Sequence, residues 1–253
     1  LSKHHAVLFA LCVQVFLQDL SNVVVAIILG YYLLMIFKQV FDKKSSTYTY
    51  IIASSEGREA LIIDPVLDNV EDYIKILNQL NLKLVKVIDT HIHADHVTGA
   101  GKLRDKTKCV TIMGEHTPTD AVELKVKDDE IIKLDKLNFR AIYTPGHTSD
   151  SFCFLMDKYL FSGDTLLING TGRTDFQNGN STDAYNSIFN RLLTLPDETL
   201  LYPAHDYKGE TVSTIGKEKR SNPRLQVRNV DEYIEIMNNL NLKKPEKIDY
   251  NVS

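Results

Sequence analysis

The hydrophobic positions of the chain follow two periods that alternate from residue 47 onward. Short runs rich in β-branched and aromatic residues predict strands, and apolar residues repeating every three or four positions predict amphipathic helices. We expect strands over 48–53, 60–63, 84–88, 109–113, 130–134, 139–143, 151–156, 159–162 and 200–202, the first two paired near the domain's edge through a turn at 54–57. We expect helices over 69–80, 183–193 (with Ser181 or Thr182 as N-cap), 211–219 and 230–240. This alternation is typical of an α/β or a layered αββα architecture.

Histidine and aspartate residues follow directly after four of the predicted strands. In chain order they are His91, His93, Asp95 and His96, then His147, Asp164 and His205. The last three stand close to Pro or Gly, where the backbone turns sharply and can hold a side chain rigidly. Because ligand sites favour the loops beyond strand ends, we expect all seven side chains on one rim.

The run 91–96 places four metal-ligand side chains within six residues. Imidazole together with carboxylate suits zinc or iron, whereas calcium and magnesium sites ask for oxygen ligands alone. His91 and His93 stand two positions apart, so in an extended segment both point the same way. The residues therefore predict a metal enzyme, with every ligand for either one or two metal ions present.

Composition narrows the classes of partner. The 253 residues carry 43% apolar side chains and a net charge of −4, which is enough apolar material for one large core, and we expect one main domain. The chain has no basic block, so nucleic acid is not an expected partner. The three cysteines, Cys12, Cys109 and Cys153, are too far apart for a disulfide framework, which favours a reducing compartment and a cytoplasmic location.

The first 34 residues differ from the rest because they hold two apolar runs separated by a polar stretch at 18–22. Spanning a bilayer takes about 20 apolar residues, and the second run, 23–37, is shorter than that. Residues 1–34 are thus read either as a membrane anchor or as a non-native extension, and membrane contact is expected only if they are native. Met35 stands where globular patterning starts, so we expect the catalytic domain to cover 35–253.

The HxHxDH motif at 91–96, the PGHT segment at 145–148, the GD pair at 163–164 and His205 resemble the metallo-β-lactamase superfamily over residues 36–250. The resemblance implies a four-layer αββα fold in which two mixed β-sheets are sandwiched between helices. It also implies one metal pocket of His91, His93 and His147 and a second of Asp95, His96 and His205. Asp164 would bridge the two.

Four further segments, 170–179, 202–207, 221–225 and 237–242, resemble the persulfide dioxygenase (ethylmalonic encephalopathy protein) family. That resemblance implies one ferrous ion held by His91, His147 and Asp164. His93, Asp95, His96 and His205 would then support these ligands, although the residues alone leave a second metal site open. The activity implied is oxidation of glutathione persulfide with O₂ and water to sulfite and glutathione, in a homodimer.

Glutathione carries carboxylates, so we expect a guanidinium near the metal, with Arg173 as first choice because Arg grips a carboxylate through two hydrogen bonds. Asp175 would fix Arg173 or accept from the substrate ammonium, and Tyr207 is a third candidate for substrate binding. The alternative enzyme is a glyoxalase II-type hydroxyacylglutathione hydrolase with two zinc ions. The alternatives for location are the mitochondrial matrix and the membrane.

Overall fold

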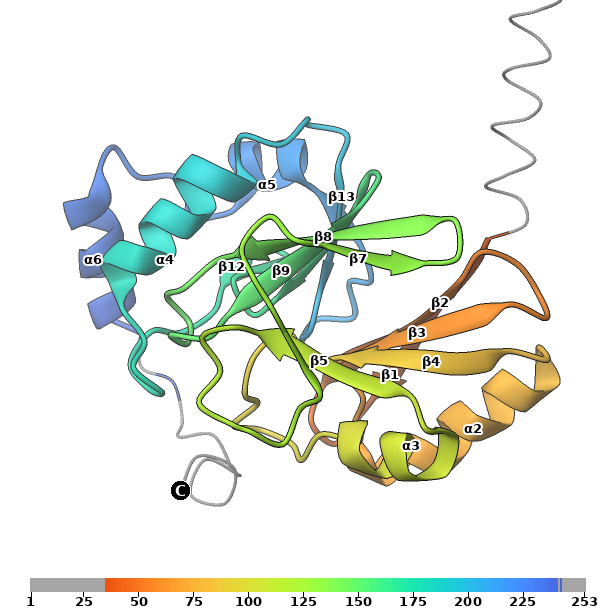
Figure 1. The fold of residues 1–253 in the computed structure, drawn as a ribbon. Helices are drawn as coiled ribbons and strands as arrows, with labels where there is room; N and C mark the ends of the chain where they lie inside the picture. Colours follow the sequence, from red (N-terminus) through yellow and green to blue (C-terminus); the bar gives the residue numbers. More distant parts are fainter. Residues whose placement is uncertain (1–34, 241, 243–253) are drawn as a thin grey trace, which may run out of the picture.

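A computed structural model of the chain describes residues 35–240 and 242. Two β-sheets face each other, and helices cover the outer face of each (Figure 1). The arrangement confirms the predicted αββα fold. The predicted segment 1–34 lies outside the described residues. Among the helices of the described part, none has the length and apolar character needed to cross a membrane.

The first sheet has six strands in the order β1-β2-β3-β4-β5-β6. They are β1 (Ile36–Asp42), β2 (Thr47–Ala53), β3 (Glu59–Ile63), β4 (Lys83–Ile88), β5 (Val110–Gly114) and β6 (Leu124–Val126). The pairs β1–β2 and β2–β3 are antiparallel and the later pairs are parallel, so the sheet is mixed. Its outer face is covered by α2 (Val70–Gln79) and α3 (Ala100–Thr107), and a 3₁₀ turn η1 (Leu67–Asn69) leads into α2 (Figure 1).

The second sheet also has six strands, in the order β14-β13-β10-β9-β8-β7. They are β7 (Ile131–Leu134), β8 (Leu137–Tyr143), β9 (Phe152–Met156), β10 (Tyr159–Gly163), β13 (Leu200–Pro203) and β14 (Ser213–Thr214). Only β10 and β13 pair in parallel. Its helices are α4 (Ser181–Ser187), which continues into a π-helical turn η2 (Ile188–Leu192), α5 (Ile215–Ser221) and α6 (Val230–Asn238). A short hairpin, β11 (Leu166–Leu167) and β12 (Gly170–Thr171), lies beyond the end of β10.

Three apolar clusters hold these layers together. The central one lies between the sheets and joins buried aromatic side chains of both, such as Tyr50, Phe139 and Phe161. A second cluster packs the first sheet against α2 and α3, and a third packs the second sheet against α4, η2 and α6. Each cluster excludes water from one interlayer space. The seven predicted ligands belong to none of the clusters and lie at the rim where the strands end.

The strand pair 48–53 and 60–63 forms as β2 and β3, and β1 pairs on the outer side of β2, so the pair lies one strand in from the edge of the sheet. Two local predictions were wrong. The helix expected over 211–219 begins only at Ile215, since Ser213 and Thr214 pair with β13 and the Thr214 hydroxyl caps the helix at Lys217 N. The N-cap of α4 is Asn180, whose side chain accepts hydrogen bonds from the next turn, and neither Ser181 nor Thr182 fills that position.

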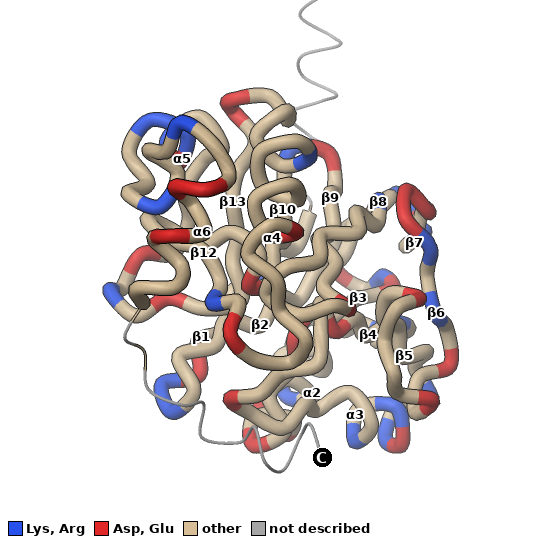
Figure 2. The backbone as a smooth tube through the Cα atoms, turned by 90° about the vertical axis from the view of Figure 1, so that its left-hand side faces the viewer, with Lys and Arg blue, Asp and Glu red and all other residues tan. Residues whose placement is uncertain are grey.

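Charged residues are interspersed on the face seen in Figure 2. Lys and Arg alternate with Asp and Glu along α5 and around the loops of the first sheet. Many of these charges form exposed ion pairs, such as Lys219 with Asp197 at 2.6 Å. Exposed pairs of this kind contribute little to stability, so the apolar clusters carry the fold.

Candidate metal centre

The ends of four strands deliver the predicted ligands to one rim of the molecule. The loop after β4 carries the HxHxDH motif, and His147, Asp164 and His205 follow β8, β10 and β13. Their potential ligand atoms form two compact groups, each with all atoms within 4.8 Å of one another. One group is His91, His147 and Asp164, and the other is His93, Asp95, His96 and His205. We call them the triad group and the second group.

Glycine allows the strand ends to approach each other this closely. Gly163 has φ +52°, and a Cβ atom there would lie 2.7 Å from the Thr90 hydroxyl oxygen. Gly146 has φ +140°, and its Cβ would lie 2.3 Å from the backbone of Ala184. Both positions combine a backbone conformation that L side chains avoid with a lack of space, so glycine is needed at each.

In the triad group, each imidazole donates a hydrogen bond through Nδ1, the ring nitrogen that faces away from the group, and this bond orients the ring. His147 Nδ1 donates to the carbonyl oxygen of Arg173 at 2.8 Å. His91 Nδ1 lies 2.9 Å from the Thr90 hydroxyl, which itself donates to Asp64, so His91 is the donor. Because Nδ1 is the donor in each ring, Nε2 is the nitrogen that remains for a metal ion.

The triad group fits a cation. His147 Nε2 lies 3.5 Å from Asp164 Oδ2. Asp164 Oδ1 is buried and accepts no hydrogen bond within residues 35–240. Burial, with smaller effects of His93 and His147, holds the pKa of His91 well below its usual value, so the imidazole stays neutral as metal binding requires. A metal ion at these atoms would satisfy all three groups at once.

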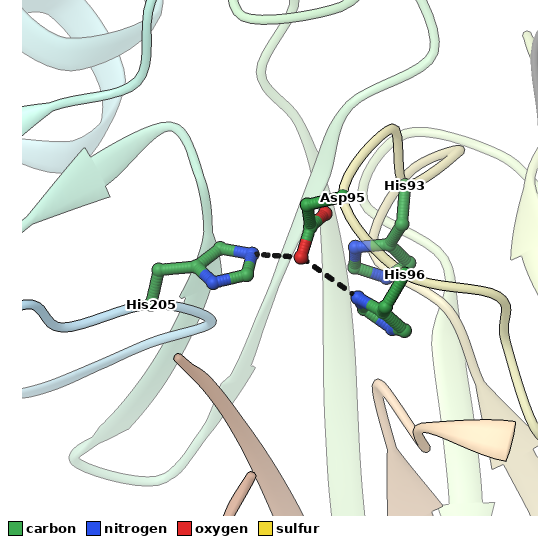
Figure 3. Close-up of side chains that lie close together, drawn as sticks. All are labelled: His93, Asp95, His96 and His205. Carbon is green, nitrogen blue, oxygen red and sulfur yellow. Dashed lines mark hydrogen bonds and ion pairs between the residues drawn. The ribbon is translucent and has the colours of Figure 1, made fainter. Parts of the chain in front are cut away.

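In the second group, Asp95 lies between two imidazoles (Figure 3). Its Oδ2 is 3.0 Å from His96 Nδ1 and 3.4 Å from His205 Nε2. Burial alone would raise the pKa of Asp95, but His205 and His96 hold it well below its usual range. His205 is fixed from behind, because its Nδ1 donates to the Ser46 carbonyl at 3.2 Å.

His93 lies beside His91, with 4.3 Å between the ring centroids, and also makes contacts of its own. Its atoms group with Asp95, His96 and His205, and also with Asp64 and Asp89, instead of with His91 and His147. The reason is Asp64, whose Oδ1 lies 3.2 Å from His93 Nε2 while the same carboxylate accepts from Thr90 N and Oγ1. Sequence reasoning missed Asp64, although it follows a strand end just as the other site residues do.

A cavity of about 390 Å³ opens beside the triad group. His147, Asp164 and His205 lie in its wall together with Arg173, Tyr207 and Arg224. This volume falls within the range of small-molecule sites. The cavity therefore gives a substrate direct access to His147 and Asp164 of the triad group, whereas His91 does not line it.

The three predicted substrate residues, Arg173, Asp175 and Tyr207, differ from one another in their contacts. Arg173 lines the cavity, but its Nε and Nη2 both donate to Asp175 at 2.7 Å, and the guanidinium lies 4.5 Å from the centre of the Phe176 ring. The hydrogen bond from Arg173 lowers the pKa of Asp175. The same pair of hydrogen bonds fixes the Arg173 guanidinium. Tyr207 lines the cavity at 72% exposure, stacked on the His205 ring at 6.1 Å. Arg224 was not predicted as a substrate contact, and its only signal was the family-like segment 221–225.

Comparison with known proteins agrees with the fold and the site. The family described as Metallo-beta-lactamase superfamily matches residues 43–123 and 114–205. The human protein named Persulfide dioxygenase ETHE1, mitochondrial, is 39% identical over 221 residues, which cover 86% of each chain. The crystal structure of ETHE1 from Myxococcus xanthus has a TM-score of 0.83 at 46% identity and covers 86% of this chain and 96% of that one.

Hydroxyacylglutathione hydrolases are also similar, over a shorter span. The protein of that name from Dictyostelium discoideum is 31% identical over 173 residues, or 63% of this chain and 62% of its own. The persulfide dioxygenases match more of the chain at higher identity. The chain belongs to the persulfide dioxygenase family of the metallo-β-lactamase superfamily.

Proposed function

We propose that the chain oxidises glutathione persulfide with O₂ and water to sulfite and glutathione, with one ferrous ion held by His91, His147 and Asp164. The observation that carries this proposal is the similarity, along 86% of the chain, to proteins named persulfide dioxygenase. Two imidazoles and one carboxylate form the ligand set typical of non-haem iron oxygenases. A ferrous ion bound there supplies the O₂ and electron chemistry that amino-acid side chains lack.

The protein's own groups position the reactants. The Arg173 carbonyl and the Thr90 hydroxyl fix the rings of His147 and His91, so these two imidazole ligands are held before substrate arrives. His147 and Asp164 face the cavity, and the reacting sulfur of a bound persulfide can therefore lie against them. His205 and Asp95 form one wall of the same space and hold or accept protons there.

Metal analysis combined with an oxygen electrode tests this proposal. We expect about one iron per chain, consumption of O₂ with glutathione persulfide, and sulfite as product. Asp164→Ala should lose iron and activity together, because it removes a charged ligand. Asp120→Ala is the matched control, since Asp120 is fully exposed and pairs only with Lys125 in the described part. Two zinc ions per chain and no O₂ consumption would contradict the proposal.

A hydroxyacylglutathione hydrolase with two metal ions is the second candidate. It is supported by the second group, which offers four further ligand atoms within 4.8 Å, and by the 31% identity to a hydrolase of that name. It predicts D-lactate release from S-lactoylglutathione and two metal ions per chain. An absence of thioester cleavage in protein that consumes O₂ with glutathione persulfide would remove it.

Assembly and location are part of the same proposal. We expect a homodimer, which light scattering of the purified protein tests. The human and mouse relatives are named as mitochondrial, which favours the mitochondrial alternative over a cytoplasmic location. Fractionation of the source cells, followed by immunodetection, distinguishes the two.

A further inference from the structure

The chain between His91 and His93 is held by hydrogen bonds to both of its peptide groups. The Ile92 nitrogen donates to Asp150 Oδ2 at 3.1 Å, and the Ile92 carbonyl oxygen accepts from Gln177 Nε2 at 2.6 Å. Ile92 belongs to none of the three apolar clusters, so packing of its side chain in a core does not fix this segment. The two hydrogen bonds therefore fix the backbone from which both histidines project.

Gln177 contacts this backbone from the wall of the cavity, where it is half-buried. The same loop carries Arg173, whose carbonyl oxygen accepts the hydrogen bond from His147 Nδ1. One loop therefore contacts two ligand segments of the triad group, at the ring of His147 and beside His91. Since His91 does not line the cavity, the Gln177 side chain connects the cavity wall with a ligand that lies behind it.

The backbone of Gln177 has a conformation that a side chain disfavours. Its φ is +49°, and Asn178 follows at +55°. Left-handed backbone is uncommon for residues other than glycine, and Asn tolerates it better than Gln does. A glycine would adopt this turn more easily but would offer no side-chain donor. Gln177 thus combines an unfavourable backbone with one hydrogen bond to the ligand segment, and strain of this kind is concentrated at functional sites.

We propose that Gln177 is a positioning residue, whose side-chain amide holds the His91–His93 segment so that His91 Nε2 stays in place to bind the metal ion. The donor is the amide nitrogen, since a carbonyl oxygen only accepts. Groups that orient metal ligands from outside the ligand set are typically worth roughly 10- to 100-fold in metal affinity or activity. The inference rests on the proposed function for the identity of the ligands and of the metal.

Release of iron from the holoenzyme to an excess of a ferrous chelator tests the proposal. Gln177→Gly removes the donor and relieves the backbone strain, and it should release iron roughly tenfold faster than the wild type or more. A residue that only makes the turn would gain from glycine, and iron release would then be unchanged or slower. Gln177→Glu keeps the size of the side chain but presents a carboxylate, which cannot donate to the Ile92 carbonyl oxygen. It should also release iron faster than the wild type.

Steady-state kinetics separate positioning from direct contact with the substrate. After loading with ferrous ion, both variants should lower kcat for glutathione persulfide roughly 10- to 100-fold and leave KM within about twofold of the wild type. Gln226→Ala is the matched control, because Gln226 Nε2 also donates to backbone carbonyl oxygens, those of Lys219 and Asn222, but does not line the cavity. It should equal the wild type in iron release, kcat and KM. A raised KM with wild-type iron release in the Gln177 variants overturns the proposal.

A spectrum recorded without turnover separates this inference from the proposed function. Nitric oxide added to the ferrous protein gives an electron paramagnetic resonance signal that depends on ligand geometry, and both Gln177 variants should change it while Gln226→Ala does not. If the wild type consumes no O₂ with glutathione persulfide, the proposed function fails while iron release and this signal still decide the role of Gln177. If the purified protein holds zinc, its release to a chromogenic chelator is measured in the same variants.

Far-ultraviolet circular dichroism shows whether each variant is folded. If Gln177→Gly does not fold, Gln177→Glu decides the question. Wild-type rates of metal release in the folded Gln177 variants overturn the inference.

Discussion

Gly172→Ala should disrupt the metal site without unfolding the protein. A Cβ at Gly172 would lie 2.0 Å from the Asp164 carbonyl oxygen and 2.9 Å from His147 Cγ and Nδ1. Since unbonded carbon and oxygen atoms prefer about 3.5 Å, the backbone of Asp164 must shift by at least about 1 Å, and the His147 ring by a smaller distance. Overpacking of this kind costs about 1–3 kcal/mol of stability.

The expected effect on turnover is larger than the effect on stability. A displacement of about 1 Å at a reacting group costs roughly 100-fold in rate, so kcat with glutathione persulfide should fall by about that factor. Iron content, kcat and the thermal midpoint are measured together with those of Gly101→Ala. Gly101 lies in α3, where an added Cβ meets nothing closer than Arg104 Nη2 at 3.9 Å, so its activity should equal that of the wild type. A Gly172→Ala protein with full iron content and wild-type kcat would refute this reasoning.

Three further predictions concern charge and burial. Asp164→Asn keeps the size of the side chain but removes its charge, so iron per chain, measured by elemental analysis, should fall at least about tenfold; a stoichiometry equal to the wild type contradicts this. The Arg58 hydrogen bonds lower the pKa of Asp135 to about 2, so its contribution to stability is present above the unfolded pKa of about 3.9 and lost below the folded value. The urea midpoint of Asp135→Asn should thus lie below that of the wild type at pH 7, and the gap should narrow from about pH 4 towards pH 2; a gap independent of pH speaks against the pairing. Burial raises the pKa of the Cys153 thiol to about 11, so at pH 8 mass spectrometry should find it alkylated only after denaturation.

The sequence predicted the central strands of both sheets well because their apolar runs are continuous and bounded by turn residues. It missed α3, whose eight residues bury only Ala100 and Leu103 and so show no clear helical period. It missed β1, which directly follows the apolar segment and has no polar boundary to mark its start. Without β1, the sequence could not show that β2 pairs with a strand on each side.

The seven site residues could be predicted because each stands next to a strand end, and strand ends share one rim. Their individual hydrogen-bond partners could not be predicted, because these depend on residues remote in sequence. His147 is oriented by Arg173, 26 positions later, and His93 by Asp64, 29 positions earlier. Neither contact leaves a spacing signal in the chain.

The distribution of these partners bears on the number of metal ions. In the second group, Asp95 is shared between His96 and His205, and His93 lies against Asp64, so protein groups already balance the charges there. In the triad group, Asp164 Oδ1 has no hydrogen-bond donor in the described part, and His147 Nε2 lies 3.5 Å from Asp164 Oδ2. Asp164 Oδ2 also lies 3.8 Å from His205 Nε2, so the two groups share contacts, and a cation in either group would replace an ion pair with an imidazole. Metal analysis of the purified protein therefore decides between one ion, as proposed for the dioxygenase, and two.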